Sequence, residues 1–99
     1  MTSKQRAYLK SLAHELQPVV QIGKDGVTPE AAESVREAFN NRELLKVQVQ
    51  KNCFDDLQTI ADTLAGRTRS QVVQVIGRKI VLYKPDPKNP KIVLPKAAK

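Results

Sequence analysis

Two glycines three positions apart, Gly23 and Gly26, bracket a loop whose residue types suit contact with an anionic oxygen. Because glycine has no Cβ, backbone N–H groups there can approach a phosphate closely, and Lys24 adds a positive charge. Thr28 is a good N-cap for a helix beginning at Pro29, so the positive end of a helix dipole follows the loop. An ordinary strand-to-helix turn would have the same residues, and the loop alone does not decide between the two. The pattern predicts a contact site for the phosphate backbone of nucleic acid, made by Gly23, Lys24, Asp25, Gly26 and Thr28.

The charge of the chain is strongly positive and unevenly distributed. The 99 residues include 17 Lys and Arg against 10 Asp and Glu, a formal net charge of +7. Residues 1–24 carry +3, residues 25–65 carry −4 and residues 66–99 carry +8. An acidic middle between two basic ends confines the positive field to part of the surface, which favours an anionic partner.

No pattern of catalytic or metal-binding residues is present in the sequence. One histidine and one cysteine cannot form a zinc site of the usual spacing, and the glycine motifs of nucleotide hydrolases and dinucleotide-binding enzymes do not occur. Asp55 and Asp56 stand where a helix is expected to begin, so capping explains them better than acid–base catalysis. We therefore expect no enzymatic activity, metal, cofactor or small-molecule substrate.

Cysteine usage and hydropathy bear on the location of the protein. The single cysteine, Cys53, cannot form an intrachain disulfide, which fits a reducing compartment. No apolar run approaches the ~20 residues of a membrane span, and the N-terminus lacks the apolar core of a signal peptide. We expect a cytoplasmic monomer that does not associate with membrane.

Aromatic residues are scarce, which narrows the mode of binding. Of the four, Phe39 and Phe54 are expected in the core, leaving Tyr8 and Tyr83. No array of rings remains on which several bases of a single strand could stack. Because A-form RNA is recognised mainly through phosphates and 2′-hydroxyls, folded RNA is a better candidate than a splayed single strand, although charge alone does not exclude DNA.

Helical periodicity predicts the first element that positions these residues. Residues 2–5 have capping-box form, and an apolar stripe follows at Leu9, Leu12, Ala13 and Leu16, which predicts a helix that ends before Pro18. Arg6, Lys10 and His14 stand four apart on this helix, and we expect them to form a basic row facing away from the core.

The remaining elements alternate between strands and helices. Strands are predicted at 19–22, 45–49, 71–76 and 80–84, and helices at about 29–41 and from 52–56 to a stop at Gly66. The buried side of the last helix is expected to include Phe54, Leu57, Ile60, Ala61 and Leu64. The order αβαβαββ predicts a single α/β domain over residues 1–84, with a four-stranded mixed sheet packed with three helices. Residues 85–99 are expected to form an extended, partly ordered basic tail.

Three segments in this order resemble a known domain: residues 16–28 (LQPVVQIGKDGVT), 73–77 (VQVIG) and 80–84 (IVLYK). Over residues 3–84 the chain resembles the CRM domain (chloroplast RNA splicing and ribosome maturation), most closely the short stand-alone bacterial YhbY family. The resemblance implies a compact α/β fold similar to the C-terminal domain of translation initiation factor three. It also implies RNA binding and association with precursors of the large ribosomal subunit.

The family's loop falls on residues 23–26, and its basic surface falls on the first helix and the closing strands. Two features depart from the family pattern: Asp25 cancels the charge of Lys24, and residues 65–70 are more basic than expected, so Arg67 and Arg69 are expected to contribute more than Lys24.

The leading hypothesis is therefore non-catalytic binding of structured ribosomal RNA during assembly of the large subunit. If the first and third strands run parallel, the glycine loop and the Arg78-Lys79 turn share one sheet edge and can contact one ligand. An alternative is an adaptor whose basic face docks an acidic protein, and a weaker one is attachment to an anionic membrane surface. The basic residues expected to contact RNA, besides Lys24, are Arg6, Lys10, Arg67, Arg69, Arg78, Lys79 and Lys84.

Overall fold

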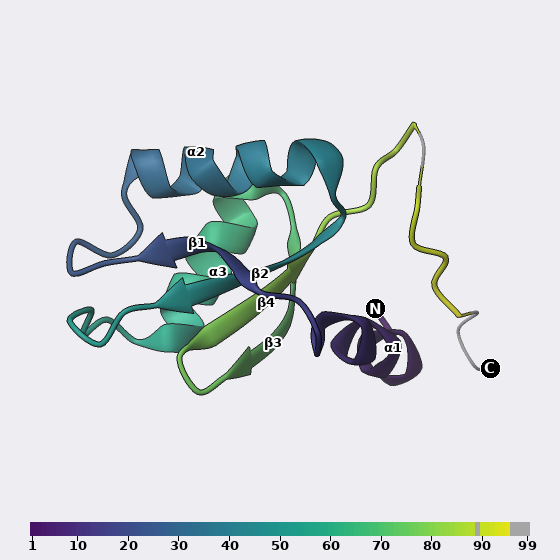
Figure 1. The fold of residues 1–99 in the computed structure, drawn as a ribbon, viewed down its shortest axis with the longest axis horizontal. Coiled ribbons are helices and arrows are strands. Elements are labelled where there is room, and N and C mark those ends of the chain that lie inside the picture. Colours follow the sequence, from purple (N-terminus) through teal and green to yellow (C-terminus); the bar gives the residue numbers. More distant parts are fainter. Residues whose placement is uncertain (89, 96–99) are drawn as a thin grey trace.

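The computed structural model describes residues 1–88 and 90–95 and has the predicted order of elements (Figure 1). The helices are α1 (Ser3–Ala13), α2 (Pro29–Ala38) and α3 (Leu57–Thr68), and a short 3-10 helix, Phe39–Asn41, follows α2. The strands are β1 (Pro18–Ile22), β2 (Leu44–Val49), β3 (Gln71–Ile76) and β4 (Lys79–Tyr83). A four-stranded mixed sheet packed with three helices confirms the predicted fold class. No helix in the described part of the chain is long and apolar enough to cross a membrane.

The strands lie in the order β1-β2-β4-β3. β1 pairs parallel with β2, and β4 pairs antiparallel with both β2 and β3, so β1, β2 and β3 all run in one direction. Their carboxyl ends meet at one side of the sheet, which we call the carboxyl edge (Figure 1). The glycine loop (23–26), the β2–α3 loop (50–56) and the β3–β4 turn (77–78) lie there. The parallel arrangement that would bring the glycine loop and the closing turn to one edge is thus confirmed.

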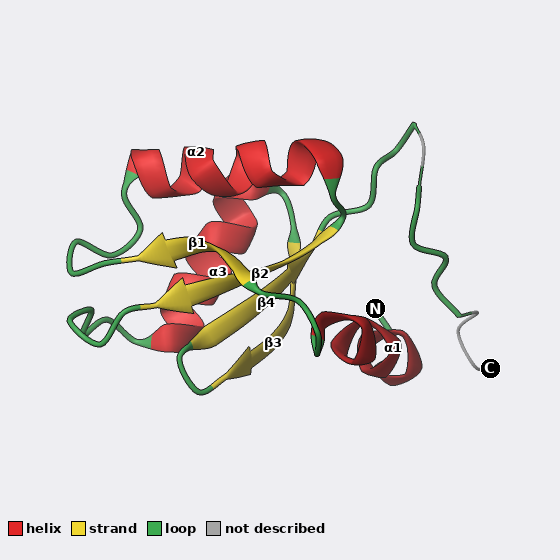
Figure 2. Ribbon diagram, viewed as in Figure 1, coloured by secondary structure: helices red, strands yellow, loops and turns green. Residues whose placement is uncertain are grey.

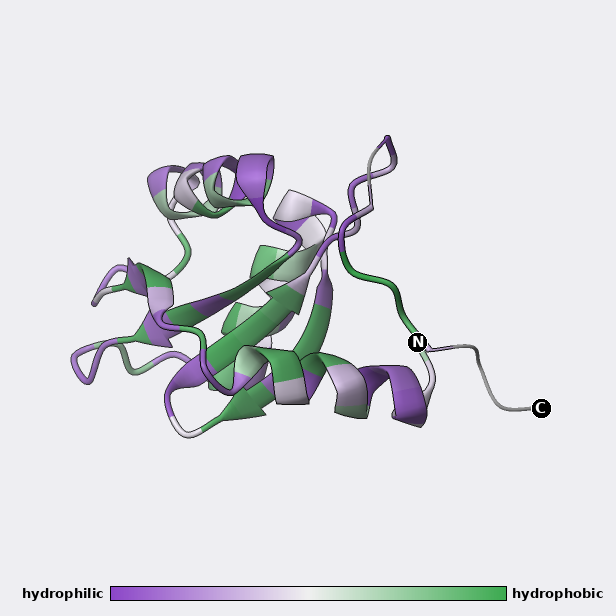
Figure 3. Cartoon of the chain, turned by 45° about the vertical axis from the view of Figure 1, so that its right-hand side comes forward, coloured by the Kyte–Doolittle hydropathy of each residue, from purple (hydrophilic) through white to green (hydrophobic). Residues whose placement is uncertain are grey.

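The two faces of the sheet have different covers (Figure 2). α2 and α3 pack on one face, and α1 packs on part of the other. Alternation along the strands decides the assignment, since Leu45 and Val47 belong to the α2 and α3 side whereas Leu44 contributes to the cluster under α1. Figure 3 shows hydrophobic residues along the strands and mostly hydrophilic residues in the loops of the carboxyl edge.

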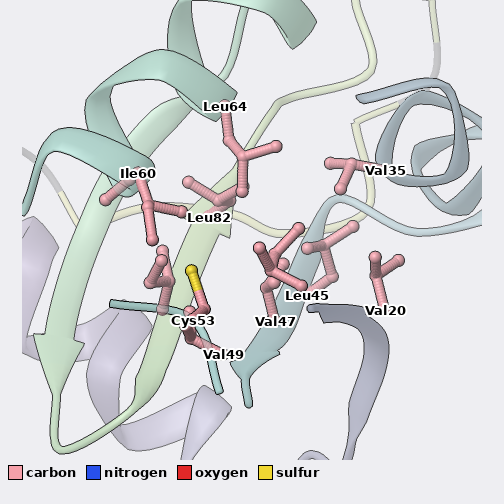
Figure 4. Packing of buried hydrophobic residues seen from close by; sticks show 12 residues of the cluster. Val20, Val35, Leu45, Val47, Val49, Cys53, Ile60, Leu64 and Leu82 are labelled. Carbon is pink, nitrogen blue, oxygen red and sulfur yellow. The ribbon is translucent and has the colours of Figure 1, made fainter. Parts of the chain in front are cut away.

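The main core lies between the sheet and the pair of helices α2 and α3 (Figure 4). Its twelve buried residues are Val20, Ile22, Val35, Leu45, Val47, Val49, Cys53, Ile60, Ala61, Leu64, Ile80 and Leu82. Phe39 packs against this core, as predicted. A second cluster under α1 consists of Leu9, Ala13, Leu44, Val73, Val81 and Tyr83.

Side-chain caps fix where the helices begin. The Gln5 N–H donates to Thr2 Oγ1, and the Thr2 N–H donates to Gln5 Oε1, each at 3.1 Å, which confirms the predicted capping box. α1 nevertheless ends at Ala13, so Leu16 lies outside the helix and is 36% exposed. The prediction that the apolar stripe continues to Leu16 is wrong, because the chain must leave the helix in time to begin β1 at Pro18.

The end of α3 also differs from the prediction. The helix does not stop at Gly66 but continues to Thr68, and Arg69 takes the left-handed conformation with φ of 56°. Thr68 is 1% exposed, and its hydroxyl donates to the Leu64 carbonyl at 2.7 Å. Burial of this threonine carries the helix two residues past the glycine, and the left-handed C-cap position falls on Arg69.

Phe54 is the third difference. It was expected on the buried side of α3, but it is 93% exposed. α3 begins only at Leu57, capped by Asp56, which places Phe54 in the preceding loop. The neighbouring Cys53, only 1% exposed, takes the buried position instead.

The described part of the C-terminal tail is tied back to the domain by a buried acid. Glu43 is 4% exposed, and its carboxylate accepts hydrogen bonds from the backbone N–H groups of Asp86, Lys91 and Ile92, at 2.7, 2.5 and 2.7 Å. Burial raises the pKa of Glu43, but the three N–H donors outweigh burial and hold it below the ordinary value. Burial, and to a lesser extent the charge of Glu43, raise the pKa of Tyr83.

Ile92 and Leu94 complete the attachment by packing against the cluster under α1, and Gln5 Nε2 donates to the Pro95 carbonyl at 3.1 Å. Residues 85–88 and 90–95 have no regular secondary structure, as predicted for the tail, but they lie along the domain. The predicted tail also includes residues 89 and 96–99, which lie outside the described residues.

Candidate nucleic-acid interface

A groove of about 710 Å³ opens between α1 and the uncovered part of the sheet, and we call it the α1 groove. Five of its lining side chains are lysine, arginine or histidine, and no Asp or Glu lines it. The lining residues are Lys10, Ser11, Ala13 and His14 of α1, Lys46 of β2, Gln74 and Ile76 of β3, Gly77 and Arg78 of the turn, and Lys79 and Val81 of β4. Positive charge without acidic partners makes this concave surface a candidate anion site.

Strand register brings two lysines together on the floor of the groove. In the antiparallel pair β2–β4, Lys46 lies opposite Val81 and Gln48 lies opposite Lys79. Lys46 and Lys79 are therefore diagonal neighbours on one face, with their Cα atoms about 7–8 Å apart. Two cationic side chains that leave one face of the sheet this close together favour an anion between them.

Arg78 lines the same groove but has a structural task as well. Its Nε donates to the Val49 carbonyl at 3.1 Å, and its Nη2 donates to the carbonyls of Gln50 and Cys53. These three bonds fasten the β3–β4 turn to the β2–α3 loop. The two N–H groups on Nη1 remain for a ligand.

The glycine loop lies at the same edge, but much of its polar backbone is already engaged. The Gly26 N–H donates to the Gly23 carbonyl at 3.0 Å, the Thr28 N–H to the Gly26 carbonyl at 3.1 Å, and the Ala31 N–H to Thr28 Oγ1 at 3.1 Å. Gly26 has φ of +70°, and a Cβ there would collide with Asp55 Oδ2. Gly26 thus serves the packing of this loop against the β2–α3 loop, while Lys24 is exposed.

The side of the glycine loop that faces α3 is acidic. A pocket of about 350 Å³ there is lined by Asp25, Asp55 and Asp56 with threonines and apolar residues. Like charges repel phosphate, so a nucleic acid at this edge is expected on the α1 side of the sheet rather than on the α3 side.

The other predicted contact residues do not join the α1 groove. Arg6 is half-buried, and its Nη1 donates to the carbonyls of Val72 and Val73 at 2.8 and 2.7 Å. The prediction that Arg6 faces away from the core is therefore wrong, because its guanidinium satisfies carbonyls at the bulge of β3. The residues at the opposite edge of the sheet are Lys84, which follows β4, and Arg67 and Arg69, which lie where α3 ends.

Of the predicted cationic contacts, the structure gathers Lys10, Arg78 and Lys79 in one groove, with Lys24 at the same edge. Two further groove residues were not among the predicted contacts, namely His14 and Lys46. Their signals were present in the sequence, since His14 continues the row of every fourth residue and Lys46 is a polar position of an alternating strand.

Comparisons with known proteins identify the family of the chain. The family model described as the CRS1/YhbY (CRM) domain matches residues 1–84. The chain is 45% identical over 95 residues to the protein named "Probable RNA-binding protein YqeI" of Bacillus subtilis, covering 96% of this chain and 99% of that protein. It is 38% identical over 96 residues to a protein named "RNA-binding protein" of Haemophilus influenzae, covering 97% and 96% of the two chains.

A solved structure shares both the sequence and the fold. The solution structure of the hypothetical protein SAV1595 from Staphylococcus aureus matches with a TM-score of 0.83 and 46% identity, covering 96% of this chain and 99% of that one. The family model matches 84 residues, and the relatives match over nearly their full length. Both findings identify the same family. The chain belongs to the CRS1/YhbY (CRM) domain family.

Proposed function

We propose that the protein is a non-catalytic RNA-binding protein that binds structured ribosomal RNA and assists assembly of the large ribosomal subunit. The observation that carries the proposal is the α1 groove, a concave surface lined by lysines and an arginine without a single carboxylate. The names of its relatives as RNA-binding proteins support RNA as the anionic partner. The resemblance to the YhbY family supports the ribosomal target.

The proposed interface runs from the α1 groove to the glycine loop. Lys46 and Lys79 contact phosphates on the floor of the groove, and Lys10 contacts them from its wall. β1 lies two strands from β4, a distance of about 10 Å across the sheet. An RNA backbone that contacts Lys79 of β4 therefore reaches Lys24, just after β1, over about that distance. This mode needs only phosphates and 2′-hydroxyls, which suits A-form RNA. We place Arg67, Arg69 and Lys84 outside this interface.

A salt titration tests the interface. The affinity of a large-subunit ribosomal RNA fragment is measured at several salt concentrations for the wild type, for Lys79→Ala and for Arg67→Ala as the matched control at the opposite edge. Loss of one phosphate contact lowers the slope of log K against log salt by about 0.7 to 0.9. We expect this for Lys79→Ala and the wild-type slope for Arg67→Ala; the reverse pattern would move the interface to the other edge.

Sedimentation of cell extract on a density gradient tests the ribosomal role. We expect the protein in fractions that contain precursors of the large subunit, and its release by ribonuclease. A partner that is retained after ribonuclease treatment would favour an adaptor for an acidic protein instead. Absence from all ribosomal fractions would contradict the assembly role while leaving RNA binding to be judged by the titration.

A further inference from the structure

Phe54 is exposed over 93% of its surface, although Cys53 before it and Asp56 two positions after it are both anchored. Cys53 is buried in the main core (Figure 4), its N–H donates to the Gln50 carbonyl at 3.0 Å, and its carbonyl accepts from Arg78 Nη2 at 2.8 Å. Asp56 caps α3 by accepting from the N–H and the hydroxyl of Thr59, each at 3.0 Å. The ring is thus held in solvent by a well-anchored loop.

The backbone of Phe54 lies between the two parts of the proposed interface, the glycine loop and the α1 groove. Asp55, the next residue, lies against Gly26 of the glycine loop. Cys53, the previous residue, is bonded to Arg78, which lines the α1 groove. The backbone of Phe54 therefore lies at the carboxyl edge, between a residue next to the glycine loop and a residue bonded to the groove-lining Arg78.

The charged residues on the two sides of Phe54 favour a phosphate on one side of the ring and an uncharged base at the ring itself. Lys51 is exposed in the turn that opens this loop, whereas Asp55 and Asp56 follow the ring and repel phosphate. A nucleic-acid base is uncharged, and its flat face stacks on an aromatic ring whatever its hydrogen-bonding pattern. A base inside an A-form duplex is already stacked on both faces, so only an unpaired base offers its face to the ring.

We propose that Phe54 stacks on one unpaired base of the bound RNA, next to phosphates held by Lys51 and the α1 groove. This inference rests on the proposed function and adds to it the kind of RNA: a duplex interrupted by a bulge or an internal loop. A single ring cannot select a base sequence, but it distinguishes an RNA with an extrahelical nucleotide from a continuous duplex.

Two RNA hairpins that differ only in one bulged adenosine test the proposal. Their affinities are measured for the wild type, Phe54→Ala, Phe54→Leu, Phe54→Trp and Tyr8→Ala. Tyr8 is a matched control, because this aromatic residue is 39% exposed and lies two residues from Lys10, about 200° away around α1. Phe54 is nearly fully exposed, so its replacement leaves the fold intact, which the thermal unfolding curve checks.

We expect the wild type to prefer the bulged hairpin and Phe54→Ala to lose about 5- to 150-fold on that hairpin alone. Phe54→Leu should behave like Phe54→Ala, and Phe54→Trp should retain the preference. The salt slope should stay unchanged, because no phosphate contact is removed. With 2-aminopurine in place of the bulged base, the wild type should change its fluorescence on binding, and Phe54→Ala should not reproduce that change.

Two results would overturn the inference while RNA binding stands. Equal affinity of Phe54→Ala and wild type for the bulged hairpin would remove the ring from the interface. An equal loss on both hairpins would show that the ring contacts the duplex rather than an unpaired base. If the wild type binds neither hairpin nor the ribosomal RNA fragment, the proposed function itself fails, and the inference fails with it.

Discussion

Replacement of Glu43 by glutamine should loosen the C-terminal tail and lower the stability of the whole domain. One carboxylate oxygen accepts from the Asp86 N–H, and the other accepts from the N–H groups of Lys91 and Ile92. Glutamine keeps one acceptor oxygen but places an NH₂ group where the second oxygen stood. At least one backbone N–H of the tail then faces another donor instead of an acceptor.

The size of the effect follows from the hydrogen bonds involved. A hydrogen bond to a charged group contributes about 1.5–3 kcal/mol, and glutamine avoids part of the desolvation cost of a buried charge. We expect the free energy of unfolding to fall by about 2 kcal/mol, which corresponds to roughly 8 to 16 °C in Tm for a domain of this size. Amide hydrogen exchange should show loss of protection at Lys91 and Ile92, beyond the general loss.

The effect should depend on pH in a defined direction. Because the pKa of Glu43 is lowered in the folded state, the unfolded chain binds more protons in acid, and this contribution to stability is present above the ordinary pKa of about 4.5. The contribution is lost as pH falls through the lowered pKa of the folded protein. The difference between wild type and Glu43→Gln should therefore be largest near neutral pH and shrink well below pH 4.5.

Asp62→Asn is a suitable control, because Asp62 is exposed and accepts a single side-chain bond from Gln58. It should change stability by less than about 0.5 kcal/mol. If Glu43→Gln unfolds like this control, or if the tail amides stay protected, Glu43 does not hold the tail. A difference that persists unchanged in acid would refute the role of the negative charge.

Two further perturbations test the carboxyl edge. Gly26→Ala should destabilise the domain by about 1–2 kcal/mol, because its φ of +70° is unfavourable for alanine and a Cβ would displace Asp55. Gly66→Ala should stabilise the domain by about 0.5–1 kcal/mol, because Gly66 lies within α3 with open space around it. Denaturant titration of both variants compares the two effects. Arg78→Lys should lower the free energy of unfolding by about 2–4 kcal/mol and increase hydrogen exchange in the β2–α3 loop, because an ammonium cannot reach all three carbonyls. Unchanged exchange in this loop would show that Arg78 does not stabilise it.

Local signals in the sequence were sufficient to predict the order of helices and strands. The caps at Thr2, Thr28 and Asp56 mark the starts of all three helices in the described residues, and each accepts the predicted backbone bond. Alternating strands gave the two faces of the sheet. The position of β4 between β2 and β3 was not predictable, because pairing partners 30 to 40 residues apart leave no local pattern.

The site residues were harder to predict for the same physical reason. Arg6 and Arg78 look like free surface cations, yet each satisfies backbone carbonyls of a distant segment. Cys53 and Phe54 are adjacent apolar residues, and a shift of one position decides which is buried. Glu43 resembles a surface acid until the tail, more than 40 residues later, supplies its partners.

The inner position of β4, the last strand in the described residues, governs when the sheet can close during synthesis of the chain. A nascent chain that has emerged only as far as β3 contains β1 and β2, which pair with each other, and β3, which has no partner yet. The position between β2 and β3, which β4 occupies in the finished sheet, is still empty. Lys79, half of the lysine pair on the groove floor, arrives with the missing strand. Any truncated product ending before residue 79 consequently lacks both the closed sheet and one lysine of the pair on the groove floor. Under the proposed function, such incomplete chains should bind RNA more weakly than finished ones.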